Sequence, residues 1–519
     1  MKTLITTLLL TASMAVCAQG YKNPILPGFH PDPSICRVDG DYYVVNSSFQ
    51  FFPGVPVSHS RDLVHWETIG YCLDQPSQLQ LNNADYWGGI YAPSIRYHNG
   101  KFYMITTNCS GKGNFFVTAT DPAGPWSEPI WVNQGGIDPC LFFDEDGKNY
   151  YVGTSDGAIR LFQIDVETGK RMGDVKTIWT GTGGRYPEGP KIYKKDGYYY
   201  LMIAEGGTEY GHKVTIARSK DITGPYESNP ANPILTHFNH QAESSPIQGL
   251  GHADLVQAED STWWVVCLGF RPQSYNHHVL GRETFLAPVT WEKNAWPVIN
   301  GDGTIQLDMK CKTLPSAPVK TTPARDNFSS DKLDFCWNYI DNPATENYSL
   351  AEHKGYLRLK ASTKTLDDKG SPTFLGRRQE NIKFTASTAL DFGKLKNGSE
   401  AGITIYMASD YHYDIAIVRN ADQASIKVTY HLGALKYSEK LIPVKGDKVY
   451  LQVSGSNDLY GLLYSTNGKQ YDKVGTANTR FISSETAGGF TGVYIGMYAQ
   501  AGNADSNYAD FDWFEYRGE

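Results

Sequence analysis

The polar and apolar positions of the first 300 residues follow one repeated pattern. A short apolar stretch is followed, about eight or nine residues after its start, by a turn and then by a run rich in aromatic and β-branched residues. Such short runs bounded by Gly, Asn or Asp indicate β-strands rather than helices. The aromatic runs begin at Asp41, Lys101, Asn149, Tyr198 and Thr262.

The turns before these aromatic runs are regularly spaced. They lie at Gly40, Gly100, Gly147, Gly197 and Ser261, so that successive copies are 47 to 64 residues apart. This spacing is typical of four-stranded propeller blades. Five blades suffice to close a ring, and closure removes exposed sheet edges. The pattern therefore predicts an all-β protein whose residues 19–310 form an N-terminal five-bladed β-propeller.

The repeat stops after Trp296, and a different pattern follows. Residues 311–325 are rich in Pro, Ser and Thr and predict an extended linker. Residues 326–519 alternate apolar and polar positions in short runs. This alternation predicts a C-terminal β-sandwich of the jelly-roll or concanavalin-like type with a core of its own. A chain of 519 residues is too long for one ordinary core, in agreement with two domains.

The first 18 residues predict a secretory signal peptide. They contain Lys2, an apolar run from Leu4 to Val16, and a small residue, Ala18, before Gln19. We therefore expect export across the inner membrane and a periplasmic location. Lipid attachment at Cys17 is the alternative, and Val16 disfavours it.

Charge and length restrict the partners. The net charge is −8 and no basic cluster occurs, which argues against nucleic acid or an anionic membrane as a partner. No later segment approaches the length of a membrane span. The sequence leaves the oligomeric state open.

The five copies of the repeat differ in the residue that opens them. The openings are Asp32-Pro-Ser-Ile, Ala92-Pro-Ser-Ile, Asp138-Pro-Cys-Leu, Glu188-Gly-Pro-Lys and His252-Ala-Asp-Leu. In a propeller the first strand of each blade lines the central axis, so we expect these openings to converge. One Asp-Pro pair alone is usually a turn former. Three acids at matched positions indicate a site.

Three converging carboxylates match the needs of acetal hydrolysis. One must be ionised to take a proton from water, and another must stay protonated to donate to the leaving oxygen. A third raises the pKa of the acid by like-charge repulsion. A propeller that only binds carbohydrate is the alternative, but such a protein gains nothing from gathered negative charge.

Together these motifs resemble glycoside hydrolase family 43, in particular its two-domain β-xylosidase and α-L-arabinofuranosidase group. The resemblance is carried by Pro31-Asp32-Pro33-Ser34, Gly136-Ile137-Asp138-Pro139, Pro187-Glu188-Gly189-Pro190 and Leu280-Gly281-Arg282-Glu283-Thr284. It covers nearly all of residues 19–519. It implies an inverting exo-glycosidase that releases non-reducing terminal α-L-arabinofuranosyl or β-D-xylosyl units from hemicellulose oligosaccharides, such as those of arabinoxylan or xyloglucan. A retaining fructosidase is the alternative, and the residues around Asp32 do not match its Asn-Asp-Pro-Asn context.

The resemblance also implies roles for individual residues. It assigns Asp32 as the general base, Glu188 as the general acid, and Asp138 as the residue that orients the acid and raises its pKa. Arg282 matches an arginine that binds sugar hydroxyls, with a surface ion pair to Glu283 as the alternative.

Aromatic residues and a histidine complete the predicted site. Phe49 matches the ring that lines the innermost subsite, whereas Phe51 and Tyr91 stand where relatives have Trp, which leaves arabinofuranose at least as plausible as xylose. His252 is expected near the axis, touching water or a cation, or else as a buried structural histidine. No cofactor is required by the resemblance, and a Ca²⁺ ion beside His252 is left open. We expect the sandwich to complete the pocket rather than to bind sugar by itself.

Overall fold

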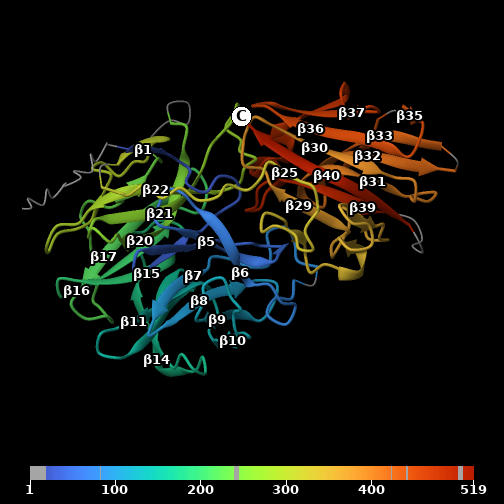
Figure 1. The fold of residues 1–519 in the computed structure, drawn as a ribbon. Coiled ribbons are helices and arrows are strands. Elements are labelled where there is room, and N and C mark those ends of the chain that lie inside the picture. Colours follow the sequence, from blue (N-terminus) through green and yellow to red (C-terminus); the bar gives the residue numbers. More distant parts are fainter. Residues whose placement is uncertain are drawn as a thin grey trace, which may run out of the picture.

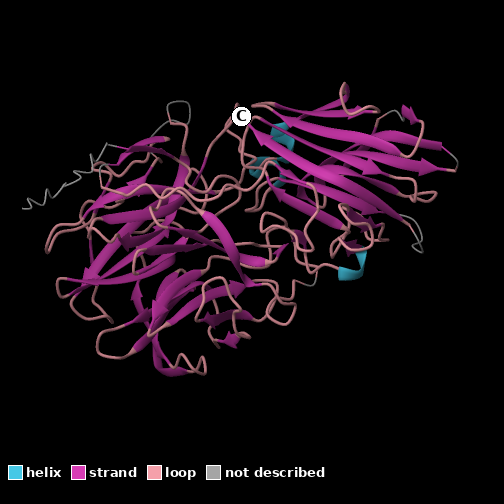
Figure 2. Cartoon of the chain, viewed as in Figure 1, coloured by secondary structure: helices cyan, strands magenta, loops and turns pink. Residues whose placement is uncertain are grey.

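The protein is built almost entirely from β-strands (Figure 2). The structure, a computed structural model, describes residues 19–81, 83–238, 245–311, 313–421, 423–439, 442–500 and 507–519, so the predicted signal peptide lies outside the described residues. Within these ranges the helical segments are α1 (Ser484–Ala487) and two 3₁₀ turns, η1 (Thr345–Asn347) and η2 (Thr479–Ile482). None of them has the length and apolar character needed to cross a membrane.

Five antiparallel sheets arranged around an axis form the N-terminal half (Figure 1). The first strand of each sheet contacts those of its neighbours, and β2 contacts β20, so the ring closes between the first and fifth blades. The predicted five-bladed propeller is therefore confirmed. The first blade contains β2 (Ser34–Val38), β3 (Asp41–Val45), β5 (Gly54–Ser60) and β6 (Glu67–Leu73), and the second contains β7 (Ser94–His98), β8 (Lys101–Asn108), β9 (Gly113–Ala119) and β10 (Ile130–Trp131). The third contains β11 (Ile137–Phe143), β12 (Asn149–Ser155), β13 (Ala158–Ile164) and β14 (Arg171–Trp179), and the fourth contains β15 (Glu188–Lys195), β16 (Tyr198–Glu205), β17 (Lys213–Ser219), β18 (Glu227–Ser228) and β19 (Leu235–Thr236). The fifth contains β20 (Gln248–Gln257), β21 (Trp263–Phe270), β22 (Glu283–Thr290) and β23 (Val298–Ile299).

The repeated aromatic runs form the second strand of every blade. Each of these strands buries at least one large ring, among them Tyr42, Tyr103, Tyr151, Tyr200 and Trp264. Each such ring removes about 150–250 Å² of surface from water. The aromatic repeat therefore supplies the packing between blades, and the openings of the first strands are left for the site. The ring is also tied at its start, where β1 (Gln19–Lys22) pairs with β24 (Asp308–Cys311).

Two packed antiparallel sheets form the C-terminal half, which confirms the predicted sandwich. Alternate apolar side chains of both sheets, among them Ile403, Ile415, Leu451 and Phe511, form one buried cluster. One sheet contains β25 (Arg325–Asp326), β27 (Tyr348–Ser349), β28 (Leu357–Lys360), β30 (Phe384–Asp391), β36 (Lys448–Gly455), β37 (Leu459–Ser465), β38 (Asp472–Asn478) and β40 (Tyr508–Gly518). The other contains β29 (Phe374–Arg378), β31 (Glu400–Ala408), β32 (Tyr411–Asn420), β33 (Gln423–Leu432), β34 (Leu435–Ser438), β35 (Ile442–Val444) and β39 (Tyr494–Gln500).

The sandwich lies against one end of the propeller and is joined to it through the backbone (Figure 1). Strand β4 (Phe51–Phe52) of the propeller pairs with β26 (Tyr339–Ile340). A buried cluster at the junction contains Phe29, Phe49 and Phe51 from the propeller together with Tyr494 and Tyr498 from β39. Because both pairing and packing cross the junction, the segment that precedes β39 is held over the propeller end.

Candidate active site

The openings of the first strands share an unusual backbone. Asp32, Asp138 and His252 adopt left-handed conformations with φ of 52°, 54° and 44°, and Gly189, next to Glu188, has φ of 62°. Non-glycine residues rarely adopt this region, and such strain is concentrated at functional sites. In β11, β15 and β20 the pairing register shifts directly after these openings. Bulges of this kind re-aim a side chain at the end of a strand.

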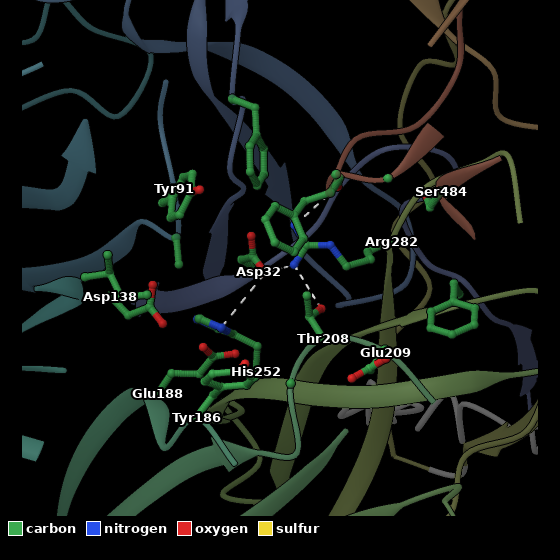
Figure 3. Close-up of a pocket in the computed structure, with 18 of the residues that line it drawn as sticks. Asp32, Tyr91, Asp138, Tyr186, Glu188, Thr208, Glu209, His252, Arg282 and Ser484 are labelled. Atoms are coloured by element: carbon green, nitrogen blue, oxygen red, sulfur yellow. Dashed lines mark hydrogen bonds and ion pairs between the residues drawn. The ribbon is translucent and has the colours of Figure 1, made fainter. Parts of the chain in front are cut away.

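These openings surround a cavity of about 550 Å³ (Figure 3). All seven residues predicted from the sequence line it: Asp32, Asp138, Glu188, Arg282, Phe49, Tyr91 and His252. The second copy of the repeat, which supplies no acid, contributes Tyr91 and Ala92 instead. The repeat has therefore brought together residues that are far apart in the chain.

Asp32 is buried and held from two sides. Arg282 Nη1 donates to its Oδ1 at 2.5 Å, and Ser47 Oγ donates to its Oδ2 at 2.5 Å. Thr208 Oγ1 accepts from the same Arg282 nitrogen at 3.2 Å. The alternative of an Arg282–Glu283 ion pair is wrong, because Glu283 accepts two hydrogen bonds from Arg271. The Asp32 carboxylate is thus fixed in one orientation.

Asp138 and Glu188 are both disposed to keep a proton. Burial, followed by the negative charges of Asp138 and Asp32, raises the pKa of Glu188 well above its usual range. Burial and the charge of Asp32 raise the pKa of Asp138, and the Gly189 amide donates to Asp138 Oδ2 at 3.0 Å. The three carboxylates therefore differ in environment: Asp32 has a guanidinium directly on it, whereas burial and the negative charge of Asp32 act on the other two.

Two buried histidines and a buried lysine lie close to the acids. His252 lies with Nδ1 3.9 Å from Asp32 Oδ1, and burial together with the charge of Lys191 holds its pKa well below the usual value. His212, which the sequence reasoning missed, places Nε2 4.0 Å from Glu188 Oε1, and burial lowers its pKa to about 4. Lys191 is fully buried, and its positive charge partly offsets the rise in the pKa of Asp138. Both imidazoles are neutral at physiological pH.

Aromatic rings form one wall of the cavity. Phe49 lies 5.2 Å from Tyr91 and 6.1 Å from Phe490 between ring centroids. The interpretation of Phe51 is corrected by the structure, because Phe51 is fully buried and stacks on Tyr494 at 3.8 Å instead of lining the cavity. Tyr91, in contrast, lines the cavity.

The sandwich contributes a second wall, which the sequence did not locate. The segment from α1 to β39 supplies Ser484, Glu485, Gly488, Gly489 and Phe490 to the lining. Glu485 accepts from His278 of the propeller at 2.7 Å, and Tyr86 donates to the Ala487 carbonyl at 2.6 Å.

A close backbone approach lets this segment reach the cavity. A Cβ on Gly281 would lie 2.9 Å from the Gly492 Cα, so two glycines allow the sandwich to reach the site beside Arg282. The sandwich completes the cavity.

The loop after β16 is another part of the lining that was missed. Gly207, Thr208, Glu209 and Tyr210 follow the end of that strand, and Tyr186 precedes Glu188. Tyr186 is 63% exposed. The signal that marks this loop is the pair Gly206-Gly207, both with positive φ, directly after a buried strand. It could have been found by comparing strand ends across the blades.

Comparisons with known proteins agree with this geometry. The model for glycosyl hydrolases family 43 matches residues 21–297, and the model for the beta xylosidase C-terminal concanavalin A-like domain matches residues 325–517. The chain is 43% identical over 515 residues to a non-reducing end α-L-arabinofuranosidase of Bacteroides ovatus, covering 98% of this chain and 96% of that relative. It is 40% identical over 511 residues to a xylosidase/arabinosidase of Butyrivibrio fibrisolvens, covering 95% and 98%. The solved structure of Bacteroides ovatus Xyloglucan PUL GH43B matches with a TM-score of 0.92 at 43% identity, covering 96% of this chain and 100% of that one.

Proposed function

The chain belongs to glycosyl hydrolase family 43, and from that premise we propose that Asp32 is the general base and Glu188 the general acid of its reaction. The protein is a glycoside hydrolase that releases non-reducing terminal α-L-arabinofuranosyl or β-D-xylosyl residues from hemicellulose oligosaccharides with inversion. The assignment rests on the contrast between the two acids: the Asp32 carboxylate is held by a hydrogen bond from Arg282, whereas the pKa of Glu188 is raised.

The proposed reaction is a single displacement. Asp32 takes a proton from a water molecule as that water attacks the anomeric carbon. The bond from this carbon to the glycosidic oxygen breaks, and Glu188 gives its proton to the leaving oxygen. Asp138 and Asp32 support the protonated state of Glu188 by like-charge repulsion. Water attacks from the face opposite the leaving group, so the released sugar has the inverted anomeric configuration.

We propose α-L-arabinofuranose as the preferred sugar, removed from xyloglucan or arabinoxylan oligosaccharides. Support comes from Tyr91, the aromatic residue that faces the site where relatives of the xylosidase type have Trp, and from the arabinofuranosidase of Bacteroides ovatus. The wall formed by Phe490 encloses the terminal sugar from the sandwich side and accounts for exo action. Arg282, whose Nη2 is 3.4 Å from the Phe490 carbonyl, is the proposed contact for the sugar hydroxyls.

A β-D-xylosidase is the second candidate, favoured by the match of residues 325–517 to the beta xylosidase C-terminal model. Comparing kcat/KM on 4-nitrophenyl α-L-arabinofuranoside and 4-nitrophenyl β-D-xyloside separates the two. We expect the arabinofuranoside to be hydrolysed faster, and a faster xyloside would reverse the preference. NMR of the first-formed anomer tests the mechanism, because retention of configuration would exclude Asp32 as a base acting through water.

Two further expectations are kept as proposals. We propose that the reaction needs no cofactor, since the proposed acid and base are both side chains. Unchanged turnover in EDTA checks this. We also propose periplasmic export with cleavage after Ala18, which would leave strand β1 complete from Gln19. Mass spectrometry of the protein purified from the periplasm should then show Gln19 at the N-terminus.

A further inference from the structure

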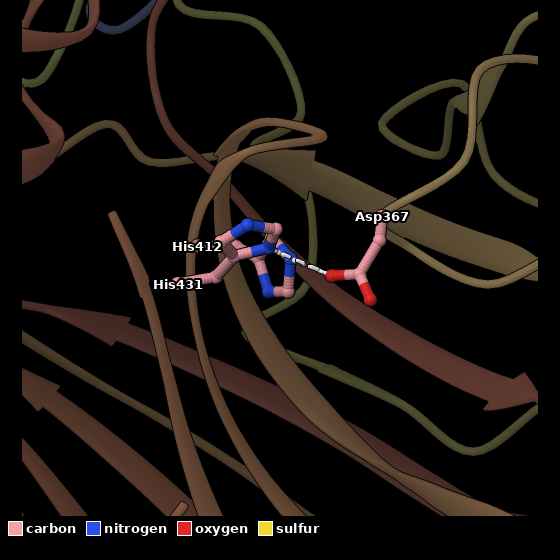
Figure 4. A group of neighbouring side chains, drawn as sticks. All are labelled: Asp367, His412 and His431. Carbon is pink, nitrogen blue, oxygen red and sulfur yellow. Dashed lines mark hydrogen bonds and ion pairs between the residues drawn. The ribbon is translucent and has the colours of Figure 1, made fainter. Parts of the chain in front are cut away.

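A group of side chains in the sandwich, away from the catalytic cavity, converges on one point (Figure 4). His431 Nδ1 lies 2.7 Å and His412 Nε2 lies 3.1 Å from the same oxygen, Oδ1 of Asp367. The two imidazole nitrogens are 3.2 Å apart. Within the described ranges this is the one set of His, Cys, Asp and Glu atoms close enough together to hold a metal ion.

The sheet fixes the two histidines in advance. His412 on β32 and His431 on β33 are directly opposite each other in the antiparallel register. Directly opposite residues have Cβ atoms about 4.5–5.5 Å apart, so both rings project from the same face of the sheet. Asp367 reaches them from the loop between β28 and β29. The cluster therefore combines a rigid pair with one carboxylate from a loop.

A second carboxylate orients the buried histidine. His412 is 1% exposed, and its Nδ1 is 2.9 Å from both oxygens of Asp414. A carboxylate behind a metal-binding histidine fixes the ring and its tautomer, and it is a regular partner in such sites.

From this geometry we infer that Asp367, His412 and His431 form a binding site for Zn²⁺ or a similar divalent transition metal. Tetrahedral coordination at 2.0–2.1 Å separates ligand atoms by about 3.4 Å, so the three atoms, now 2.7–3.2 Å apart, need to move apart by only a few tenths of an ångström to 0.7 Å. Two imidazoles and one carboxylate favour Zn²⁺ over Ca²⁺ or Mg²⁺, which prefer oxygen ligands. Asp367 is 31% and His431 13% exposed, which leaves a path for the ion from solvent.

The site would connect the sandwich with the propeller. The Asp367 loop also contains Leu366, which is buried in the junction cluster, and Lys369, which forms an ion pair with Asp85 of the propeller. An ion bound by Asp367 and the two strands would fasten this loop. Lys436, directly opposite His431 on β34, pairs with the other oxygen of Asp367, and its charge opposes a metal there.

The test uses the full-length protein without an affinity tag, after treatment with EDTA, titrated calorimetrically with ZnCl₂. We expect one Zn²⁺ per chain, no competition from a tenfold excess of Ca²⁺, and a visible ligand-field band when Co²⁺ replaces Zn²⁺. His431→Gln and Asp367→Asn should each weaken Zn²⁺ binding at least about tenfold. Lys436→Met should strengthen it.

The matched control is His353→Gln. His353 also pairs with an aspartate of the sandwich, Asp510, at 2.8 Å, but among the described residues no second histidine shares that aspartate. This control should bind Zn²⁺ as the unaltered protein does. Zn²⁺ should also raise the Tm of the unaltered protein but not that of His431→Gln. The inference is overturned if the unaltered protein binds no more Zn²⁺ than His431→Gln, or if Ca²⁺ displaces Zn²⁺. Hydrolysis of 4-nitrophenyl glycosides without metal shows that each variant is folded.

Discussion

Arg282 donates a 2.5 Å hydrogen bond to Asp32 across 250 positions of the chain. One residue opens the first blade and the other precedes the third strand of the fifth, so the contact spans the closure of the propeller ring. The guanidinium also faces the rings of Phe49 and Phe490, at 5.6 and 5.7 Å from their centroids. Arg282 therefore links the first and fifth blades, orients the proposed base and contacts the segment that the sandwich contributes.

Replacing Arg282 by lysine keeps the charge but removes the planar fork. A lysine cannot reach Asp32, Thr208 and the Phe490 carbonyl together, so the carboxylate loses its fixed orientation. Misplacement of a catalytic group by about 1 Å costs on the order of 100-fold in rate. We expect Arg282→Lys to lower kcat/KM by about 10- to 100-fold on aryl arabinofuranosides. Activity equal to the unaltered enzyme would mean that charge alone is needed there.

Replacing Asp32 by asparagine removes the proposed base. We expect kcat to fall by about 10²–10⁴-fold, because general base catalysis contributes that much, while circular dichroism and Tm show a folded protein. Asp39→Asn is the matched control. Asp39 also has positive φ, at 53°, but it is exposed in the turn between β2 and β3 and should tolerate the change. Full turnover by folded Asp32→Asn would refute the assignment.

Replacing Asp138 by asparagine should shift the pH profile. The charge of Asp138 helps to raise the pKa of Glu188, so its removal lowers the pKa of the acid. Glu188 then loses its proton at lower pH, and the alkaline limb of kcat/KM should move down by about one pH unit. The exposed Asp146, in the turn after β11, provides the control, and Asp146→Asn should leave the limb in place. A limb that stays or moves upward would contradict the proposed role.

Replacing Phe490 by alanine tests whether the sandwich takes part in the site. The ring contacts Phe49 and Arg282, and loss of such contacts removes about 0.5–1.5 kcal/mol for an aromatic pair. We expect kcat/KM to fall by about five- to tenfold and the Tm to fall by no more than a few degrees, since Phe490 is 38% exposed. Phe481, 47% exposed in η2 and outside the cavity lining, is the matched control. Equal activity of the two variants would show that the Phe490 ring of the sandwich has no part in substrate hydrolysis.

The sequence was sufficient for the propeller and its acids because both depend on a repeat. Equivalent positions in successive blades point to the same axis, so Asp32, Asp138 and Glu188 could be placed together without a structure. Contacts between domains have no such regularity. The role of Phe490 depends on the close approach of Gly281 and Gly492, which are not near each other in the chain.

The alternation of apolar and polar positions also cannot predict which of two apolar surroundings an aromatic side chain occupies. It could not show that Phe51 faces β39 while Phe49, two residues earlier, faces the cavity. His212 was missed for a related reason. It lies after β16, outside the strand openings, and reaches Glu188 because Gly251 leaves room for its ring: a Cβ there would lie 2.1 Å from His212 Cε1.

Gly189 provides a last test. Comparing its replacement with that of Gly197 separates the cost of a left-handed backbone from an effect on the site. A Cβ on Gly189 would meet the His252 ring at 3.0 Å, and Gly189 also donates its amide to Asp138. Gly197, at the turn of the same blade, has a similar φ, +75° against +62°, but a Cβ there would meet nothing within 4 Å. Both Gly→Ala changes carry the cost of a left-handed alanine, about 1–2 kcal/mol, and should lower the Tm by a few degrees.

Only Gly189→Ala should also displace His252 and weaken the hydrogen bond to Asp138. We therefore expect Gly189→Ala to lower kcat by about tenfold or more and Gly197→Ala to leave kcat unchanged, as measured by steady-state kinetics well below either Tm. If both variants lose stability equally and both keep full kcat, the packing of Gly189 on His252 has no part in holding the acids in place, and the left-handed openings serve only the turn of the chain into each blade.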